Sequence, residues 1–255
     1  MRSHMQYRST ISRFLVLTSL IAAPYLPVSA QPAPERQFLD IEGDTYVGEI
    51  DTAARSGIVS GFPDRTFRPR ESLTREQLLS IMVDAMPKVP LTNLNLSSPP
   101  TPKPLPKVPT QVSSNPFPDT SKNRWSAAKI QYMKDLGIIR GYPDGTFRPT
   151  QTVTRAELIV MLDAVDRFLV EWRGNWDAQQ FLGALPPLPF SDVRGHWAEN
   201  KIQQMSSYCF QQRVATYLDE KGTKFAPNAP AQRNYAAAAT LRAVQCLSIY
   251  PPSPS

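Results

Sequence analysis

The chain carries one sequence unit three times, and a fold built from repeats is therefore expected before any other feature is considered. The second repeat is the most complete. It opens at Phe117-Pro-Asp119 and continues through the segment GYPDGTFRP, residues 141–149, to Thr154-Arg-Ala-Glu157. The other repeats open at Phe38-Leu-Asp40 and Phe190-Ser-Asp192, and the arginine of the second repeat, Arg155, recurs as Arg75 and Arg233.

Each repeat has the pattern of a helix, a turn and a second helix. In the second repeat Ile130, Met133 and Leu136 share one face of the first helix, and Gly137 is placed to end it in the left-handed conformation. The second helix follows with an apolar stripe at helical spacing. Its members are Leu158, Met161, Leu162, Val165, Phe168, Leu169 and Trp172.

The start of the second helix carries a capping box in two repeats. Thr154 and Glu157 can exchange hydrogen bonds with each other's backbone amides, and Thr74 with Gln77 can do the same. Gln232, at this position in the third repeat, is followed three residues later by Tyr235, which cannot complete the box. We therefore expect a frayed or differently capped helix there.

The repeats and the segments between them divide the chain. Nine prolines fall between residues 87 and 116, which predicts an extended linker with polyproline II character. The predicted parts are a signal peptide (1–30), a first repeat (38–86), the Pro-rich linker (87–116), a second repeat (117–172), a connection (173–189), a degenerate third repeat (190–250) and a tail (251–255).

The first thirty residues have the pattern of a secretory signal peptide. Arg2, Arg8 and Arg13 precede an apolar run at 14–23, and small residues follow at 28–30. The run is shorter than a bilayer-spanning helix. An amphipathic surface helix and a retained signal anchor are the alternatives. We expect an exported chain, located in the periplasm or the cell wall, without a transmembrane segment once the signal is removed.

Composition excludes several functions. The net charge of +6 falls to +3 without the leader, too small and too dispersed for a nucleic-acid partner. The common nucleotide-binding and zinc-protease motifs are absent, so we expect no metal, no cofactor and no catalytic residues. Export would allow a disulfide between Cys209 and Cys246, and two small buried thiols are the alternative.

The repeated residues resemble the S-layer homology (SLH) motif, which would be present in three copies with the third degenerate. The resemblance covers most of residues 38–250 outside the linkers. It implies an all-α fold in which three helix-turn-helix repeats form a pseudo-threefold spindle around a central helical bundle. It also implies a non-catalytic module that binds pyruvylated, peptidoglycan-linked polysaccharide in grooves between repeats. The groove-lining positions of the family correspond here to Arg75, Arg155, Arg233, Trp125, Trp197, Asp40, Asp119 and Asp192.

The residues themselves support a role for the arginines. Arg155 is the first residue of a predicted helix, where its side chain is free to reach outward, and a guanidinium binds a carboxylate through two hydrogen bonds. The helix N-terminus would add free amides for the same anion. The alternative for Arg75, Arg155 and Arg233 is an ion pair with a neighbouring acid.

The acids and tryptophans have alternatives of their own. For Asp40, Asp119 and Asp192 we favour helix capping over contact with a ligand. Trp125 and Trp197 can stack on the apolar face of a sugar, but packing in the core is favoured for both. The first repeat has Tyr46 near the tryptophan position.

The repeats also depart from the motif in ways that limit the function. Arg65 stands where the second repeat has Gly145, and the third repeat has lost the GYPDG turn. At most two competent grooves are therefore expected. The alternative function is a periplasmic protein–protein adaptor whose repeats have lost glycan binding and whose Pro-rich linker meets an envelope protein. A glycosidase is disfavoured because no pair of carboxylates is marked by its spacing.

Overall fold

The computed structural model describes residues 37–89, 104–172, 185–208 and 213–247. This part of the chain holds α-helices and short 3-10 turns and no strand, which confirms the all-α class. Each repeat contributes two helices. They are α1 (Val47–Arg55), α2 (Arg75–Ala85), α3 (Ala127–Asp135), α4 (Arg155–Trp172), α5 (Glu199–Ser207) and α6 (Arg233–Cys246), with 3-10 turns η1 (Met86–Lys88) and η3 (Leu218–Glu220).

The helix ends follow the sequence signals. Gly137 has a φ of 71° and ends α3, and the amide of Ile138 bonds to the carbonyl of Met133 at 3.0 Å, as the glycine predicts. The capping boxes of α2 and α4 are also present, with the Thr154 amide donating to Glu157 at 2.8 Å. Gln232 makes no side-chain cap, so α6 is capped differently, as predicted.

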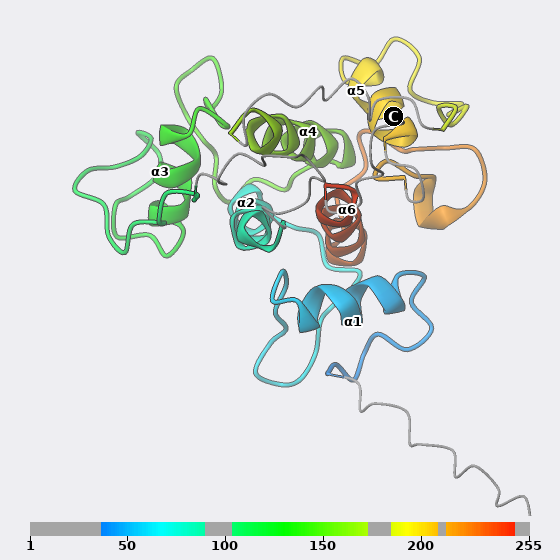
Figure 1. Cartoon of the computed structure of the whole chain (residues 1–255), viewed down its shortest axis with the longest axis horizontal. Helices are drawn as coiled ribbons and strands as arrows, with labels where there is room; N and C mark the ends of the chain where they lie inside the picture. The colour runs from blue at the N-terminus through cyan, green and yellow to red at the C-terminus, as the bar shows by residue number, and fades with distance from the viewer. Residues whose placement is uncertain (1–36, 90–103, 173–184, 209–212, 248–255) are drawn as a thin grey trace, which may run out of the picture. The chain divides into compact units, whose positions relative to one another are not determined.

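The second helices of the three repeats, α2, α4 and α6, pack against one another and appear side by side in Figure 1. α6 is the most buried of them, and Ala236, Ala237, Ala238 and Ala239 have no exposed surface. Alanine has the smallest side chain that still favours a helix, so this run lets neighbouring helices approach closely. The apolar stripe predicted for residues 158–172 also faces inward, with Leu158, Leu162, Val165 and Leu169 at most 5% exposed.

The first helix of each repeat packs on the second helix of another repeat. α3 contacts α2, α5 contacts α4, and α1 contacts α6. We call these contacts the first junction (repeats 1 and 2), the second junction (repeats 2 and 3) and the third junction (repeats 3 and 1). The order is cyclic, because the first repeat packs on the third although about 190 residues separate the contacting side chains.

A ring of three backbone hydrogen bonds joins the repeats. The amide of Leu73 donates to the carbonyl of Ala231 (2.9 Å), that of Ala231 to Val153 (2.9 Å), and that of Val153 to Leu73 (3.0 Å). All three residues are fully buried. Because backbone groups make these bonds, the degenerate third repeat takes part in the ring as fully as the others do.

Ion pairs cross every junction at the third residue of a first helix. At the first two junctions a lysine on the first helix meets an aspartate on the second helix, whereas the third junction has the opposite polarity. The distances are 2.7 Å for Lys129–Asp84, 3.1 Å for Lys201–Asp163 and 2.6 Å for Glu49–Arg242.

Several sequence predictions lie wholly or partly outside the described residues, among them the tail (251–255) and most of the connection (173–189). The signal peptide and the bridge from Cys209 to Cys246 are others, although Cys246 itself is buried. Of the Pro-rich linker only 87–89 and 104–116 are described; residues 104–109 have no regular secondary structure, and Leu105 packs against the core. Among the described helices none is both long and apolar enough to cross a membrane.

Candidate functional site

The aspartates that open the repeats bind a turn. Each carboxylate accepts hydrogen bonds from two successive backbone amides, at residues 67 and 68, 147 and 148, or 225 and 226, at 2.7–2.9 Å. The second residue of each pair has a φ near 58°, so the carboxylate holds a left-handed turn in place. The prediction of helix capping for Asp40, Asp119 and Asp192 is therefore wrong, because their acceptors face this turn and not a helix end.

The three arginines point into the neighbouring repeat. Each Nε donates to the carbonyl of the phenylalanine in that turn, one junction further on. The pairs are Arg75 with Phe147 (3.0 Å), Arg155 with Phe225 (2.7 Å) and Arg233 with Phe67 (2.7 Å). The same arginine and the same carbonyl thus meet at all three junctions.

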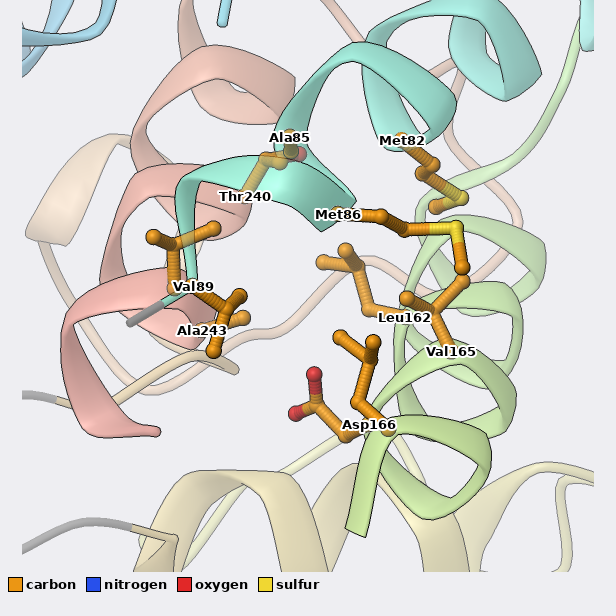
Figure 2. A pocket seen from close by; sticks show the side chains of 11 residues that line it. Met82, Ala85, Met86, Val89, Leu162, Val165, Asp166, Thr240 and Ala243 are labelled. Atoms are coloured by element: carbon orange, nitrogen blue, oxygen red, sulfur yellow. The ribbon is translucent and has the colours of Figure 1, made fainter. Parts of the chain in front are cut away.

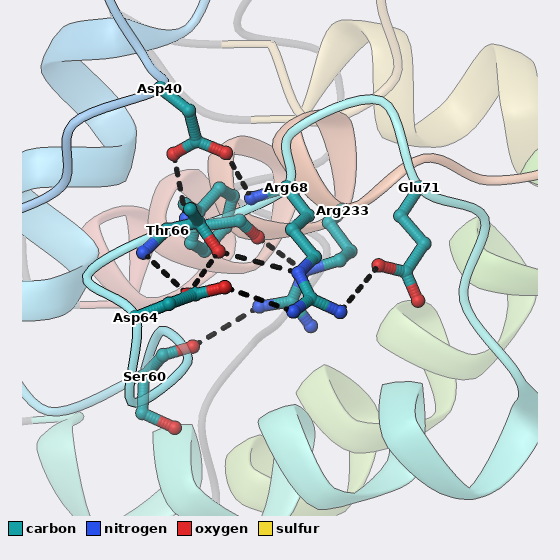
Figure 3. A network of polar contacts seen from close by, with 8 residues as sticks. Asp40, Ser60, Asp64, Thr66, Arg68, Glu71 and Arg233 are labelled. Atoms are coloured by element: carbon teal, nitrogen blue, oxygen red, sulfur yellow. Dashed lines mark hydrogen bonds and ion pairs between the residues drawn. The ribbon is translucent and has the colours of Figure 1, made fainter.

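Burial closes two of the arginines to a ligand. Arg155 is 2% exposed, donates to the Thr216 carbonyl at 3.0 Å and stacks on the Tyr235 ring at 3.6 Å. Arg233 is 8% exposed and donates to the Ser60 carbonyl at 3.1 Å, as Figure 3 shows. Burial lowers the pKa of Arg233. The prediction that the Arg155 side chain reaches outward is wrong, because backbone carbonyls of the next repeat hold it inside. Arg233, predicted to line a groove, is held in the same way.

The helix N-termini are also occupied. The first two amides of α4 donate to the carbonyls of residues 229 and 227, and those of α2 and α6 make the equivalent bonds at 2.9–3.1 Å. The anion site predicted at these amides is therefore absent from the described helices. The neighbouring repeat caps them instead, which also explains how α6 begins without a side-chain cap.

Arg75 is the most open of the three arginines. Its side chain keeps 11% exposure, and its Nη1 lies 3.5 Å from Glu157 Oε1, at the limit of a hydrogen bond. The Tyr142 hydroxyl donates to the same carboxylate oxygen at 3.0 Å, and the guanidinium lies 4.7 Å from the centre of the Tyr142 ring. The ion pair considered as an alternative thus exists at Arg75, in a weak form.

The two tryptophans are exposed. Trp125 is 60% and Trp197 66% exposed, so the prediction that both pack in the core is wrong. Each lies two residues before a first helix, Trp125 before α3 and Trp197 before α5. These two helices pack on the second helix of the preceding repeat, so both tryptophans adjoin the helices that form a junction. Thr45 takes this place in the first repeat, whereas Tyr46 is the next residue and is buried.

A buried acid that the sequence patterns did not indicate lies beside Trp125. Glu76, the second residue of α2, is 5% exposed and accepts two hydrogen bonds of 2.6 Å from Arg124 and one of 2.5 Å from Ser126. Burial raises the pKa of Glu76, but hydrogen bonds from Arg124, Ser126 and the Trp125 side chain outweigh it and leave the pKa lowered. One feature of the sequence could have singled out Glu76: it is the only acid at this position of the three repeats, because the others have Ala156 and Asn234 there.

Comparison with known families agrees with this geometry. A model of the S-layer homology domain matches residues 37–79 and 116–159, the first two repeats. The first two repeats are S-layer homology domains.

The relatives of these S-layer homology domains are larger surface proteins. The chain is 28% identical to "Cell surface glycoprotein 1" of Acetivibrio thermocellus over 58% of its own length and 6% of that protein's. It is 25% identical to the "Cellulosome-anchoring protein" of the same organism (71% of this chain, 34% of that protein). It is also 25% identical to an "S-layer protein" of Bacillus licheniformis (68% and 17%). The chain thus spans about a third of one relative and less of the others.

The third repeat makes the same contacts as the two matched ones. It lies outside the two matched segments, yet Asp192 holds the amides of Phe225 and Ala226 at 2.8 Å, and Arg155 reaches that turn as Arg75 reaches the turn of the second repeat. The third repeat has therefore diverged in sequence but keeps the contacts of the other two.

Two other features of the repeats bear on ligand binding. An apolar pocket lies between the later turns of α2, α4 and α6 (Figure 2), but its lining begins seven residues, or about 10 Å, beyond the arginines. It is lined mainly by Met82, Met86, Leu162, Val165 and Ala243. Within the described residues, no group of three His, Cys, Asp or Glu side chains could hold a metal ion.

Proposed function

We propose that this chain is a non-catalytic module that anchors to the cell envelope by binding wall polysaccharide. The S-layer homology domains and the surface-anchoring names of the relatives support this class of function. The observation that carries the proposal is a pair of tryptophans at equivalent positions, both exposed by more than half. An isolated exposed tryptophan is common, but the same exposed tryptophan at two junctions indicates a repeated binding position.

The tryptophans act as platforms for sugar rings. The C–H groups on the apolar face of a sugar pack on an aromatic ring, and an indole offers the largest such surface. Trp125 serves the first junction and Trp197 the second. The third junction has Thr45 instead and does not bind, so the module has two binding positions.

Arg75 supplies the contact to an anionic group. A pyruvate ketal on the polysaccharide carries a carboxylate, which a guanidinium binds well. Arg75 holds its acid partner only at 3.5 Å, and its side chain is the least buried of the three arginines. Arg155 and Arg233 have a structural role between repeats, and Arg75 is the arginine that contacts the ligand.

Co-sedimentation of the full chain with isolated wall sacculi, with and without their ketal groups, tests the proposal. Trp125→Ala/Trp197→Ala should lose at least tenfold in affinity, while Leu39→Ala, a change at an apolar side chain that is 65% exposed, should bind like the parent. Arg75→Gln should weaken binding only to sacculi that carry ketals. Unchanged binding by the double tryptophan variant would overturn the platform assignment.

The adaptor function is the second candidate. It is favoured by one observation, the exposed side chains of Pro104, Pro106 and Val108 (37% exposed), an arrangement suited to an aromatic groove on a partner protein. In this case the chain would bind an envelope protein through that segment and ignore sacculi. Replacement of Pro106 and Pro109 by alanine would then abolish binding, and the tryptophan variants would not.

A further inference from the structure

We propose that Glu76 is a positioning residue for sugar binding: it fixes Trp125 and makes the first junction the tighter of the two binding positions. The inference rests on the proposed function, because it specifies how one of the two platforms is held. Glu76 itself is buried and contacts no sugar. It acts on Trp125 through the residues on either side.

The contacts of Glu76 bracket Trp125. Arg124 donates two hydrogen bonds of 2.6 Å, one to each carboxylate oxygen, and Ser126 donates one of 2.5 Å. These two residues immediately precede and follow Trp125, so the backbone that carries the indole is tied to α2 on both sides. The Trp125 side chain lies near enough to Glu76 to help lower the pKa of its carboxyl group. The backbone beneath the indole is thereby fixed while 60% of the residue stays open to solvent.

The second junction lacks this arrangement. Ala156, His196 and Ala198 stand where the first junction has Glu76, Arg124 and Ser126. Trp197 lies instead against the ring of His196, with ring centres 5.5 Å apart and planes inclined by 37°. His196 accepts a hydrogen bond from the Ala198 amide through Nδ1 and contacts Asn228 through Nε2, so its contacts stay within the third repeat.

The different anchoring of Trp125 and Trp197 predicts that the two positions bind polysaccharide with unequal affinities. A side chain that is already ordered loses less conformational entropy when a ligand binds, and each such side chain affects affinity by about three- to tenfold. The residues on either side of Trp125 are tied across the junction by three charge-assisted hydrogen bonds to Glu76, whereas Ala156 can make no equivalent bond beside Trp197. Trp125→Ala should therefore weaken binding to polysaccharide more than Trp197→Ala does.

The chain itself offers the matched variant. The triple change Glu76→Ala/Arg124→His/Ser126→Ala converts the first junction to the side chains of the second, a combination that already folds in this protein. We expect it to bind wall polysaccharide about three- to tenfold more weakly. The same three changes in a Trp125→Ala background should cause no further loss. A loss of equal size in both backgrounds would overturn the inference.

A readout without ligand separates this inference from the proposed function. In a ¹⁵N-labelled chain the indole N–H signal of Trp125 is assigned by its disappearance in Trp125→Phe. Its ¹⁵N order parameter should be high in the parent and clearly lower in Glu76→Ala, while that of Trp197 should not change. Equal order parameters in the two proteins would show that Glu76 does not hold Trp125. A high order parameter with no sugar binding would instead refute the proposed function alone.

Discussion

Arg242 on α6 donates a hydrogen bond of 2.6 Å to Glu49 on α1, and this pair reverses the polarity found at the other two junctions. The Arg242 side chain is 12% exposed and also donates to Glu220 at 2.8 Å. A first helix that carries Glu49 matches α6 and would place like charges together on α2 or α4, where Asp84 and Asp163 lie. The reversed pair therefore favours closure of the first repeat on the third.

The reversed pair gives the first prediction. Glu49→Lys should lower the free energy of unfolding by about 2 kcal/mol, since it sets a lysine against a mostly buried arginine. Arg242→Ala in the Glu49→Lys background should recover part of the loss, although Arg242→Ala alone destabilises. Urea unfolding of the parent, the single and the double variants measures this coupling. Strictly additive losses would show that the two residues do not interact.

The internal arginines give the second prediction. Arg155→Ala should lower the free energy of unfolding by about 3 kcal/mol, because it leaves the buried carbonyls of Phe225 and Thr216 without a donor. Arg75→Ala should cost about 1 kcal/mol, since its site is more open to water. Thermal and urea unfolding give both values. If Arg155→Ala kept the parent's stability and lost only sugar binding, its assignment as a structural residue would be wrong.

The directions of these arginine side chains could not be predicted from the sequence, whereas the helices could. The period of the apolar residues, the capping boxes and Gly137 specify the helices and their ends, because such signals act within a few residues of the chain. The direction of Arg155 depends on Phe225, 70 residues away, and no local pattern reports which carbonyl faces a side chain across a junction. The expectation of a free guanidinium failed for this reason.

The wrong predictions for the two tryptophans, and the absence of any prediction for Glu76, have a related cause. A tryptophan beside a helix is more often buried than exposed, but Trp125 and Trp197 lie at the rim of a junction that forms only when the repeats associate. Glu76 occupies a position that its own helix does not require to be acidic. Its role follows from Arg124 on the next repeat, and only the assembled structure brings the two together.

Acid should destabilise the fold through two carboxylates. Hydrogen bonds to the Glu76 carboxylate and backbone amides to that of Asp119 outweigh the effect of burial and lower both pKa values. A lowered pKa stabilises the folded state above the ordinary value, 4.5 for Glu76 and 3.8 for Asp119, and this contribution is lost as the pH falls through the folded value. The melting temperature should therefore be nearly constant from pH 7 to about 5 and fall below about 4.

Substitution of one carboxylate tests the assignment of that acid effect. Glu76→Gln removes a titrating group, so it should lower the melting temperature at pH 7 and flatten its dependence on pH below 5. Glu42→Gln, the same change at an exposed carboxylate, is the matched control and should keep the slope of the parent. A slope in Glu76→Gln as steep as that of the parent would assign the acid sensitivity to other groups.

Two glycines of the second repeat separate backbone strain from steric overlap. Gly141 and Gly145 have φ values of 77° and 79°, so alanine is strained at both. A Cβ on Gly145 meets nothing within 4 Å, whereas a Cβ on Gly141 would lie 2.7 Å from the Thr146 carbonyl oxygen and 2.8 Å from the Phe117 ring. Gly145→Ala should cost about 1 kcal/mol of unfolding free energy and Gly141→Ala about 3 kcal/mol. Arg65 tolerates a φ of 62° at the position equivalent to Gly145, which agrees with the smaller value. Urea unfolding of the two variants gives the order, and equal losses would mean that the turn around residues 141–147 moves aside to admit the methyl group.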